Sequence, residues 1–202
     1  KGIHVYLNGN DEFYQFLRQE AVAKKCLIKP FFAESILEQN NSAVSTIAAD
    51  FDLTPDEIEK GVKAFVPSHN RMEFLELPND ILIINDSYNA NPDSMRFALA
   101  YLKQRARGRR LAILGDMLEL GDHAVKEHQK LSVTDCSIVV TVGELARHIE
   151  GAGQVVHCSA NTEVVQQTLS LLKPGDTILI KGSRGMKLEE VAYALREKLI
   201  KK

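Results

Sequence analysis

Cysteine is scarce in this sequence of 202 residues. Its three cysteines, Cys26, Cys136 and Cys158, are odd in number and show no CxxC spacing. The sequence therefore predicts neither a disulfide framework nor a zinc site. Unpaired cysteines of this kind are typical of a reducing compartment, so we expect a cytoplasmic protein.

Long runs of apolar residues or of like charges are also missing. No apolar stretch approaches the roughly 20 residues that cross a bilayer, so we expect no membrane insertion. The formal net charge is −2, and the one basic cluster, residues 103–110, is better explained as a solvated helix end than as a nucleic-acid site. The start, Lys1-Gly2-Ile3-His4, has neither an initiator Met nor a signal-peptide pattern. We expect the chain to begin inside a longer protein.

The sequence has no glycine-rich nucleotide motif. Neither GxxxxGK[ST] nor GxGxxG occurs in it. A reaction driven by a nucleoside triphosphate needs a cradle for the phosphates and their magnesium, so we expect these residues alone to be inactive in such a reaction.

Strands and helices alternate regularly in the last two thirds of the chain. With 45% hydrophobic residues the chain can bury a core, and this alternation predicts an α/β, Rossmann-like, doubly wound domain with a mostly parallel sheet. Its first two strands, joined by a short turn, are expected to be antiparallel. The predicted strands are 71–77, 81–84, 111–114, 137–142, 154–157 and 177–180, and the predicted helices are 94–104, 124–131, 144–149, 162–172 and 188–200.

The first third of the chain follows a different pattern. A strand over residues 3–7 and a turn lead into a helix that begins near Phe13. Two further helices are predicted over residues 36–51 and, after Thr54 as N-cap and Pro55, to about residue 65. A helix-breaking segment at residues 67–70 then predicts a boundary between residues 1–67 and 68–202.

Polar residues follow directly after the apolar strand 81–84. The carboxylate of Asp86 suits the two hydroxyls of a ribose, and a turn cap is an equally good interpretation. Tyr88, Asn89 and Asn91 offer a ring and two amides that suit an adenine or a peptide, although asparagine also favours turns. We regard all four as candidate nucleotide-binding residues.

Two later strands end in similar loops. Residues 115–121 contain Gly115, Asp116 and Glu119, an acidic loop that is a candidate for binding a substrate. His123 and His128 follow it, but they are five residues apart and do not share a helix face, so we predict no metal site. Polar loops at the carboxyl ends of parallel strands indicate a single cleft.

The third loop, Lys181-Gly182-Ser183-Arg184, combines two cations with free backbone amides. This combination suits a carboxylate or a phosphate better than it suits a capping turn, and Lys181, Ser183 and Arg184 are candidate substrate-binding residues. Arg71, just before the antiparallel pair, would be an ordinary surface residue in most chains.

The motifs around Arg71, Asp86, Asp116 and Ser183, in this order along the chain, resemble those of the Mur ligase family of peptidoglycan synthesis. The resemblance is greatest to the member of the family that adds D-alanyl-D-alanine. The resemblance extends from about Asn40 to the end of the chain. It implies a fragment of the central ATPase domain followed by the C-terminal Rossmann-like domain. The motifs are residues 71–73 (RME), 85–95 (NDSYNANPDSM), 115–121 (GDMLELG) and 181–184 (KGSR).

The resemblance also implies roles for individual residues. Asn40 would meet adenine, Arg71 would reach the ATP phosphates as the catalytic cation, and Asp86 would bind the ribose. Ser183 and Arg184 would hold the incoming amino substrate. The implied reaction uses ATP and Mg²⁺ to phosphorylate a carboxylate of UDP-N-acetylmuramoyl-tripeptide, and the amine of D-Ala-D-Ala then attacks the acyl phosphate.

Two hypotheses follow for the chain itself. In the first it is part of such a ligase, depends on the N-terminal and central domains that it lacks, and by itself neither turns over ATP nor binds a cofactor tightly. In the second it is a truncated, non-catalytic module that binds a nucleotide or a partner. The sequence does not disclose the oligomeric state, and a monomer is our default expectation.

Overall fold

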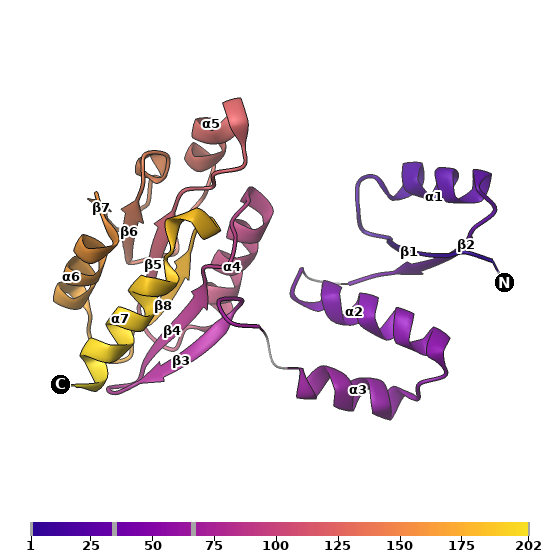
Figure 1. Ribbon diagram of the computed structural model, residues 1–202, viewed down its shortest axis with the longest axis horizontal. Coiled ribbons are helices and arrows are strands. Elements are labelled where there is room, and N and C mark those ends of the chain that lie inside the picture. The colour runs from indigo at the N-terminus through magenta and orange to yellow at the C-terminus, as the bar shows by residue number, and fades with distance from the viewer. Residues whose placement is uncertain (1, 34–35, 66–67, 202) are drawn as a thin grey trace. The chain divides into compact units, whose positions relative to one another are not determined.

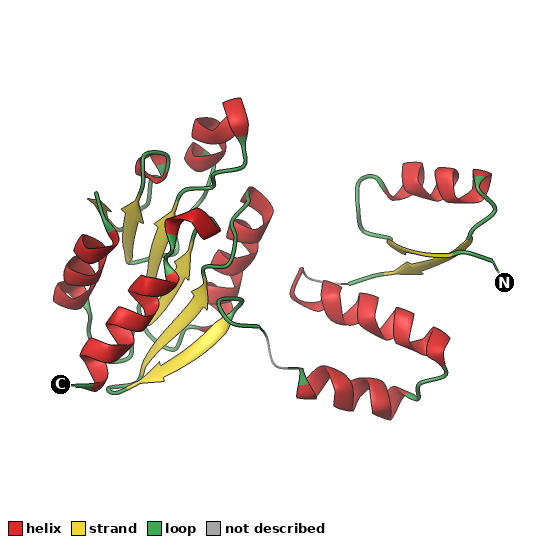
Figure 2. Cartoon of the chain, in the orientation of Figure 1, coloured by secondary structure: helices red, strands yellow, loops and turns green. Residues whose placement is uncertain are grey.

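The computed structural model describes residues 2–33, 36–65 and 68–201, which belong to two compact units, residues 1–66 and 67–202. Figures 1 and 2 show the helices and strands of both units. None of the helices formed by the described residues has the length and apolar character that crossing a bilayer requires.

The first unit is built on two parallel strands joined by a helix. The predicted opening strand and helix are confirmed, but the second strand was not predicted, because Pro30 interrupts its apolar pattern. Strand pairing begins where His4 lies opposite Leu27. The elements are β1 (His4–Asn8), α1 (Tyr14–Ala23), β2 (Leu27–Phe31), α2 (Ile36–Ala48), the 3-10 turn η1 (Ala49–Phe51) and α3 (Pro55–Ala64).

Asp50 ties the strands of this unit to η1. Its carboxylate accepts a hydrogen bond from the Tyr6 hydroxyl at 2.6 Å and also contacts the side chains of His4 and Lys29. The hydrogen bond from Lys29, followed by those from Tyr6 and His4, holds the pKa of Asp50 well below its usual value. One carboxylate thus joins three segments.

The second unit has a six-stranded sheet in the order β3-β4-β8-β5-β6-β7. Only the β3 and β4 pair is antiparallel, as predicted. The strands are β3 (Glu73–Leu77), β4 (Ile81–Asp86), β5 (Arg110–Gly115), β6 (Ile138–Val142), β7 (Gln154–Cys158) and β8 (Thr177–Lys181). The helices are α4 (Pro92–Arg105), α5 (Ala124–Gln129), α6 (Asn161–Leu171) and α7 (Glu189–Ile200), with 3-10 turns η2 (Gly121–His123), η3 (Ala146–His148) and η4 (Arg184–Met186).

Helices cover both faces of this sheet, so the predicted doubly wound α/β fold is confirmed (Figure 1). Successive strand residues point to opposite faces, and consequently Ile83 packs in one core and Ile84 in the other. The first core is completed by α6 and α7 and the second by α4. Residues 81–84 of β4 and 111–114 of β5 lie between the two cores and are all apolar, which explains the continuous hydrophobic runs in the sequence.

The helix predicted over residues 144–149 is wrong, because this segment forms only the short turn η3. Gly143 has a positive φ of 109°, and at Ile149 the backbone is already extended. The amides of Leu145 and Ala146 donate to the Asp116 carboxylate, at 3.0 and 2.7 Å. A side chain from the loop after β5 therefore accepts hydrogen bonds from the first amides of this turn, which have no acceptor within the turn itself.

Candidate functional site

The carboxyl ends of β4, β8 and β5 form the candidate site. These strands are neighbours in the sheet, and Lys181 lies opposite both Asp86 on β4 and Leu114 on β5. Gly115 and Gly182 come so close that a Cβ on Gly182 would lie 3.1 Å from the Gly115 Cα. The prediction that these polar loops share one edge is confirmed.

Asp86 and Lys181 form an ion pair at the centre of this edge. Lys181 Nζ lies 2.6 Å from Asp86 Oδ2 and donates to the Asn89 carbonyl at 2.8 Å. The Lys181 side chain is 2% exposed and that of Asp86 is 14% exposed. Lys181 is therefore a counterion of Asp86 in this structure, whereas the sequence had suggested a cation open to an anionic ligand.

The polar side chains of the loop after β4 differ in their hydrogen-bond partners and in their exposure. Asn91 Oδ1 accepts from the Ser94 amide at 2.8 Å, and together these residues form the N-terminal capping box of α4. The cap that the sequence placed alternatively at Asp86 thus belongs to Asn91. Asn89 accepts from the Ala90 amide at 2.8 Å, and Tyr88 is 37% exposed.

Arg71 lies in a strained turn before β3. Asn70 and Met72, on either side of it, have positive φ values of 62° and 48°, a conformation that is uncommon for a side chain like that of Met. The turn is held by β4 and its loop, since the Met72 amide donates to Asp86 Oδ1 at 3.2 Å and the Tyr88 amide donates to the Asn70 carbonyl at 2.9 Å. Strain of this kind persists only where surrounding contacts hold it.

A network of polar side chains, which the sequence did not reveal, joins this turn to β3, β4 and α7. The side-chain Nδ2 of Asn85 donates to Asn70 Oδ1 and to Glu73 Oε2, both at 3.0 Å. The Ser87 hydroxyl donates to Asn85 Oδ1 at 2.6 Å. Tyr193 of α7 donates to Glu73 Oε2 at 3.0 Å. Tyr193 is 120 positions from Glu73 in the sequence, so no local pattern could indicate this contact.

The network changes the acidity of two of its members. Burial alone would raise the pKa of Glu73, but hydrogen bonds from Asn85, Tyr193 and Asn70 outweigh it, so the pKa is lowered. Burial, followed by the hydrogen bond to Glu73, raises the pKa of Tyr193. Glu73 is therefore an ionised acceptor and Tyr193 a protonated donor at neutral pH.

Two arginines contact the Tyr88 ring. Arg71 Cζ lies 3.9 Å from the ring centroid and Arg184 Cζ lies 5.4 Å from it, both within the range of cation–π contacts. Both arginines are exposed residues. This arrangement brings together three residues that the sequence placed in separate motifs.

The loop after β5 is held from inside. Asp116 is buried and binds the amides of Leu145 and Ala146, while Ser183 Oγ accepts from the Leu118 amide at 2.9 Å. Both side chains therefore fix loop geometry, and only Glu119 of this loop's acidic candidates is exposed.

No metal site is found among the residues that the structure describes. His128 is fully buried, where its Nε2 accepts from the Met117 amide at 3.0 Å and its Nδ1 lies 2.7 Å from the Ala124 carbonyl. Both ring nitrogens are thus used inside the protein.

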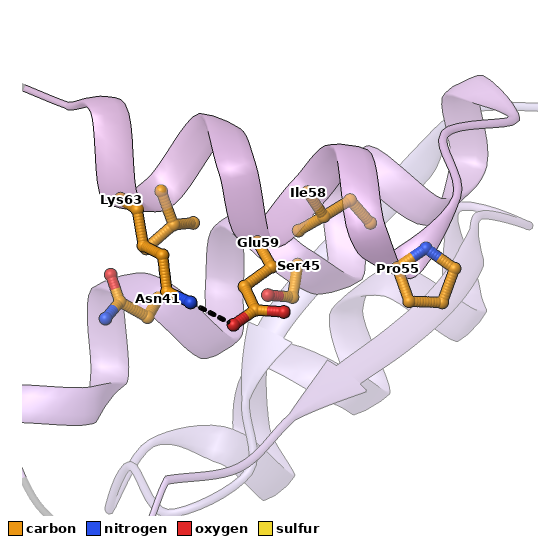
Figure 3. A pocket seen from close by; sticks show the side chains of 7 residues that line it. Asn41, Ser45, Pro55, Ile58, Glu59 and Lys63 are labelled. Carbon is orange, nitrogen blue, oxygen red and sulfur yellow. Dashed lines mark hydrogen bonds and ion pairs between the residues drawn. The ribbon is translucent and has the colours of Figure 1, made fainter.

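Asn40 is an exposed residue of α2 in the first unit. Its neighbour Asn41 lines an open groove of about 430 Å³ between α2 and α3. Figure 3 shows Ile58 of α3 and the ion pair of Glu59 with Lys63 on one side of this groove. The groove combines an apolar floor with amide and hydroxyl groups.

Comparison with known proteins gives consistent results. The family described as "Mur ligase, glutamate ligase domain" matches residues 70–184. A UDP-N-acetylmuramoyl-tripeptide–D-alanyl-D-alanine ligase of Bacillus subtilis is 34% identical in an alignment 186 residues long, which covers 84% of this chain and 41% of the relative. The chain thus spans less than half the length of this relative.

Two solved structures share the fold. MurF from Acinetobacter baumannii is similar with a TM-score of 0.84 and 24% identity, over 96% of this chain and 51% of that one. MurF ligase from Thermotoga maritima, in complex with ADP, is similar with a TM-score of 0.83 and 18% identity, over 99% of this chain and 54% of that one.

Proposed function

This chain belongs to the Mur ligase family, and from that premise we propose that it is part of an ATP-dependent ligase that adds D-Ala-D-Ala to UDP-N-acetylmuramoyl-tripeptide. The name of the Bacillus subtilis relative supports this choice of substrates. In this reaction ATP phosphorylates the acceptor carboxylate, and the dipeptide amine displaces phosphate from the acyl phosphate. Developing charge on the transferred phosphoryl group requires cations near it.

The observation that carries the proposal is the cluster of polar groups at the ends of β4, β8 and β5. Asp86 is a partly exposed carboxylate that suits a ribose. Arg71 and Arg184 are exposed cations that lie at the ring of Tyr88, two residues after Asp86. This set fits a nucleotide and an anionic substrate group. The solved complex of a fold relative with ADP is compatible with this interpretation.

The same residues do not fit a magnesium ion. Among the described residues no three carboxylate, histidine or cysteine side chains are grouped to hold one, and Asp86 is already paired with Lys181. We therefore assign Mg²⁺ and the phosphate loop to the part of the parent enzyme outside these 202 residues. Residues 1–67, with Asn40, would be a fragment of the central ATP-binding domain, and residues 68–202 the C-terminal domain.

The three cysteines are free, which supports a reducing cytoplasm as the site of action. We expect the chain to be monomeric and, alone, to lack enzymatic activity.

Reconstitution tests this proposal. The 202-residue chain is fused to the N-terminal segment of the Bacillus subtilis relative that it does not match, and ligation of D-Ala-D-Ala to the UDP-linked tripeptide is followed with ATP. We expect ligation by the fusion and none by either part alone. ATP turnover by the isolated chain at about 1 per second or faster, a rate typical of enzymes, would contradict the proposal.

Calorimetry separates the enzyme part from a stand-alone binding module. The isolated chain is titrated with ATP, AMP and D-Ala-D-Ala. Half of an active site binds each of them very weakly, whereas a module retained for binding takes up one of them tightly. Tight binding together with an inactive fusion would favour the module.

A further inference from the structure

Tyr88 connects two loops that are far apart in the sequence. Its ring has Arg71 at 3.9 Å, from the turn before β3, and Arg184 at 5.4 Å, from the loop after β8. Both arginines are exposed, yet both lie against the same ring. Long arginine side chains on a surface would otherwise sample many rotamers, so the ring restricts where the two charges lie.

The backbone on both sides of the ring supports this arrangement. Arg71 lies between two residues of left-handed backbone, and the Tyr88 amide itself holds the turn through the Asn70 carbonyl. On the other side, the Ser183 amide donates to the Asp116 carbonyl at 2.9 Å, directly before Arg184. Both arginines thus start from fixed backbone positions.

Neither Arg71 nor Arg184 takes part in the ion pairs formed by the residues that the structure describes. The nearby Lys181, by contrast, is neutralised by Asp86. Two like charges held at one ring repel each other, and an anion that carries more than one charge relieves this repulsion. The arrangement therefore favours a ligand with neighbouring phosphates.

We propose that Tyr88 is a positioning residue, whose ring holds Arg71 and Arg184 together as a receptor for a diphosphate or longer phosphate chain. This inference rests on the proposed function and adds to it the group that places the two cations. It differs from the interpretation of Tyr88 as a platform for adenine or a peptide, because Arg71 already lies over the ring at 3.9 Å. It also assigns Arg184 to the phosphates, and not to the incoming amino substrate as the family resemblance implied, because Arg184 shares this ring with Arg71.

The ring, and not the hydroxyl, carries this role. Arg71 and Arg184 both lie over the ring of Tyr88 and not at its hydroxyl. Tyr88→Phe therefore keeps the receptor, while Tyr88→Leu removes it.

Pyrophosphate binding to the 202-residue chain tests the proposal by NMR titration. Tyr88→Leu should weaken binding about two- to fivefold, the change that corresponds to about 0.5–1 kcal/mol for an exposed cation–π contact. Tyr88→Phe should bind like the unmodified chain. Phe74→Leu is the matched control, because Phe74 is 41% exposed and has Arg105 at 5.9 Å from its ring, at another place in the same unit.

Two further readouts distinguish positioning from a general structural role. The side-chain Nε–H signals of Arg71 and Arg184 should lose their ring-current shifts in Tyr88→Leu, while the thermal midpoint stays that of the unmodified chain. In the background Arg71→Gln/Arg184→Gln, Tyr88→Leu should have no further effect on pyrophosphate binding.

Several results would overturn the proposal. One is an absence of pyrophosphate binding by the unmodified chain, and another is unchanged Arg71 and Arg184 signals in Tyr88→Leu. The third is that Tyr88→Leu weakens binding equally in the Arg71→Gln/Arg184→Gln background, which would mean that the ring contacts the ligand itself. Failure of the proposed function is recognised separately, as an inactive fusion in the ligation assay, because pyrophosphate binding needs no peptide substrate.

Discussion

The Lys181 ammonium lies 2.6 Å from the Asp86 carboxylate, and this contact joins β8 to β4 at the edge where the candidate site lies. Lys181 also donates to the Asn89 carbonyl and thereby holds the loop that contains Tyr88. The ion pair therefore fixes the positions of β4, β8 and the loop with Tyr88, while Arg71 and Arg184 are exposed and can contact a ligand.

Replacing Lys181 by Met should destabilise the second unit by about 3 kcal/mol, because a largely buried carboxylate is left without its partner. Urea denaturation measures the loss, and the double variant Lys181→Met/Asp86→Asn should regain part of it. Lys103→Met is the control, since Lys103 pairs with Asp135 at 3.0 Å on the surface and should cost less than about 1 kcal/mol. Equal losses in Lys103→Met and Lys181→Met would contradict this view of the pair.

Asp86→Asn should raise the KM for ATP in the active fusion about tenfold or more, because a charged acceptor for the ribose hydroxyls is lost. The KM for D-Ala-D-Ala should stay the same. Steady-state kinetics provide both constants, and Asp93→Asn, an exposed acid in the first turn of α4, is the control. An unchanged KM for ATP would count against the ribose role.

Asn91→Ala should cost about 1 kcal/mol of stability, because α4 loses its N-cap. Asn91→Asp should restore most of this, since aspartate caps equally well. Asn89→Ala should change stability little, because the Asn89 side chain accepts a hydrogen bond from the adjacent Ala90 amide and caps no helix. If Asn91→Ala leaves the urea midpoint unchanged but weakens nucleotide binding, then Asn91 acts on the ligand and not on the helix.

Glu73→Gln should make the second unit less sensitive to acid. The pKa of Glu73 is lowered in the folded protein, so its ionised form contributes stability that is fully present above the ordinary value of 4.5 and is lost as pH falls through the folded pKa. The difference in urea midpoint between the unmodified chain and Glu73→Gln should therefore shrink below about pH 4.5. Glu76→Gln, an exposed change on the same strand, should show no such trend.

Local patterns predicted most of the fold correctly. The runs around Ile83 and Ile178 are apolar throughout because both faces of the sheet are covered, and the Thr54-Pro55 start of α3 is a local signal. The pattern failed at β2, where Pro30 interrupts the apolar pattern of a strand. It also failed at residues 144–149, where the backbone is extended again at Ile149 after the single turn η3.

The candidate site was predicted in part. The sequence located the loops with Asp86, Tyr88 and Ser183 because polar residues directly after apolar strands mark the carboxyl edge of a parallel sheet. It could not assign the side chains within these loops to binding or to structure. Lys181 and Asn91 both proved to have partners inside the protein.

By itself the sequence determined most of the strands and helices, the mostly parallel sheet and the edge at which polar groups gather, because these follow from the period of apolar residues and from local turn chemistry. Only the tertiary structure decided which charges are paired and which are exposed. Lys181 finds Asp86 across 95 positions of the chain, and Arg71 and Arg184 meet at Tyr88. Such contacts depend on how β8 is inserted between β4 and β5, a long-range pairing that no local pattern contains.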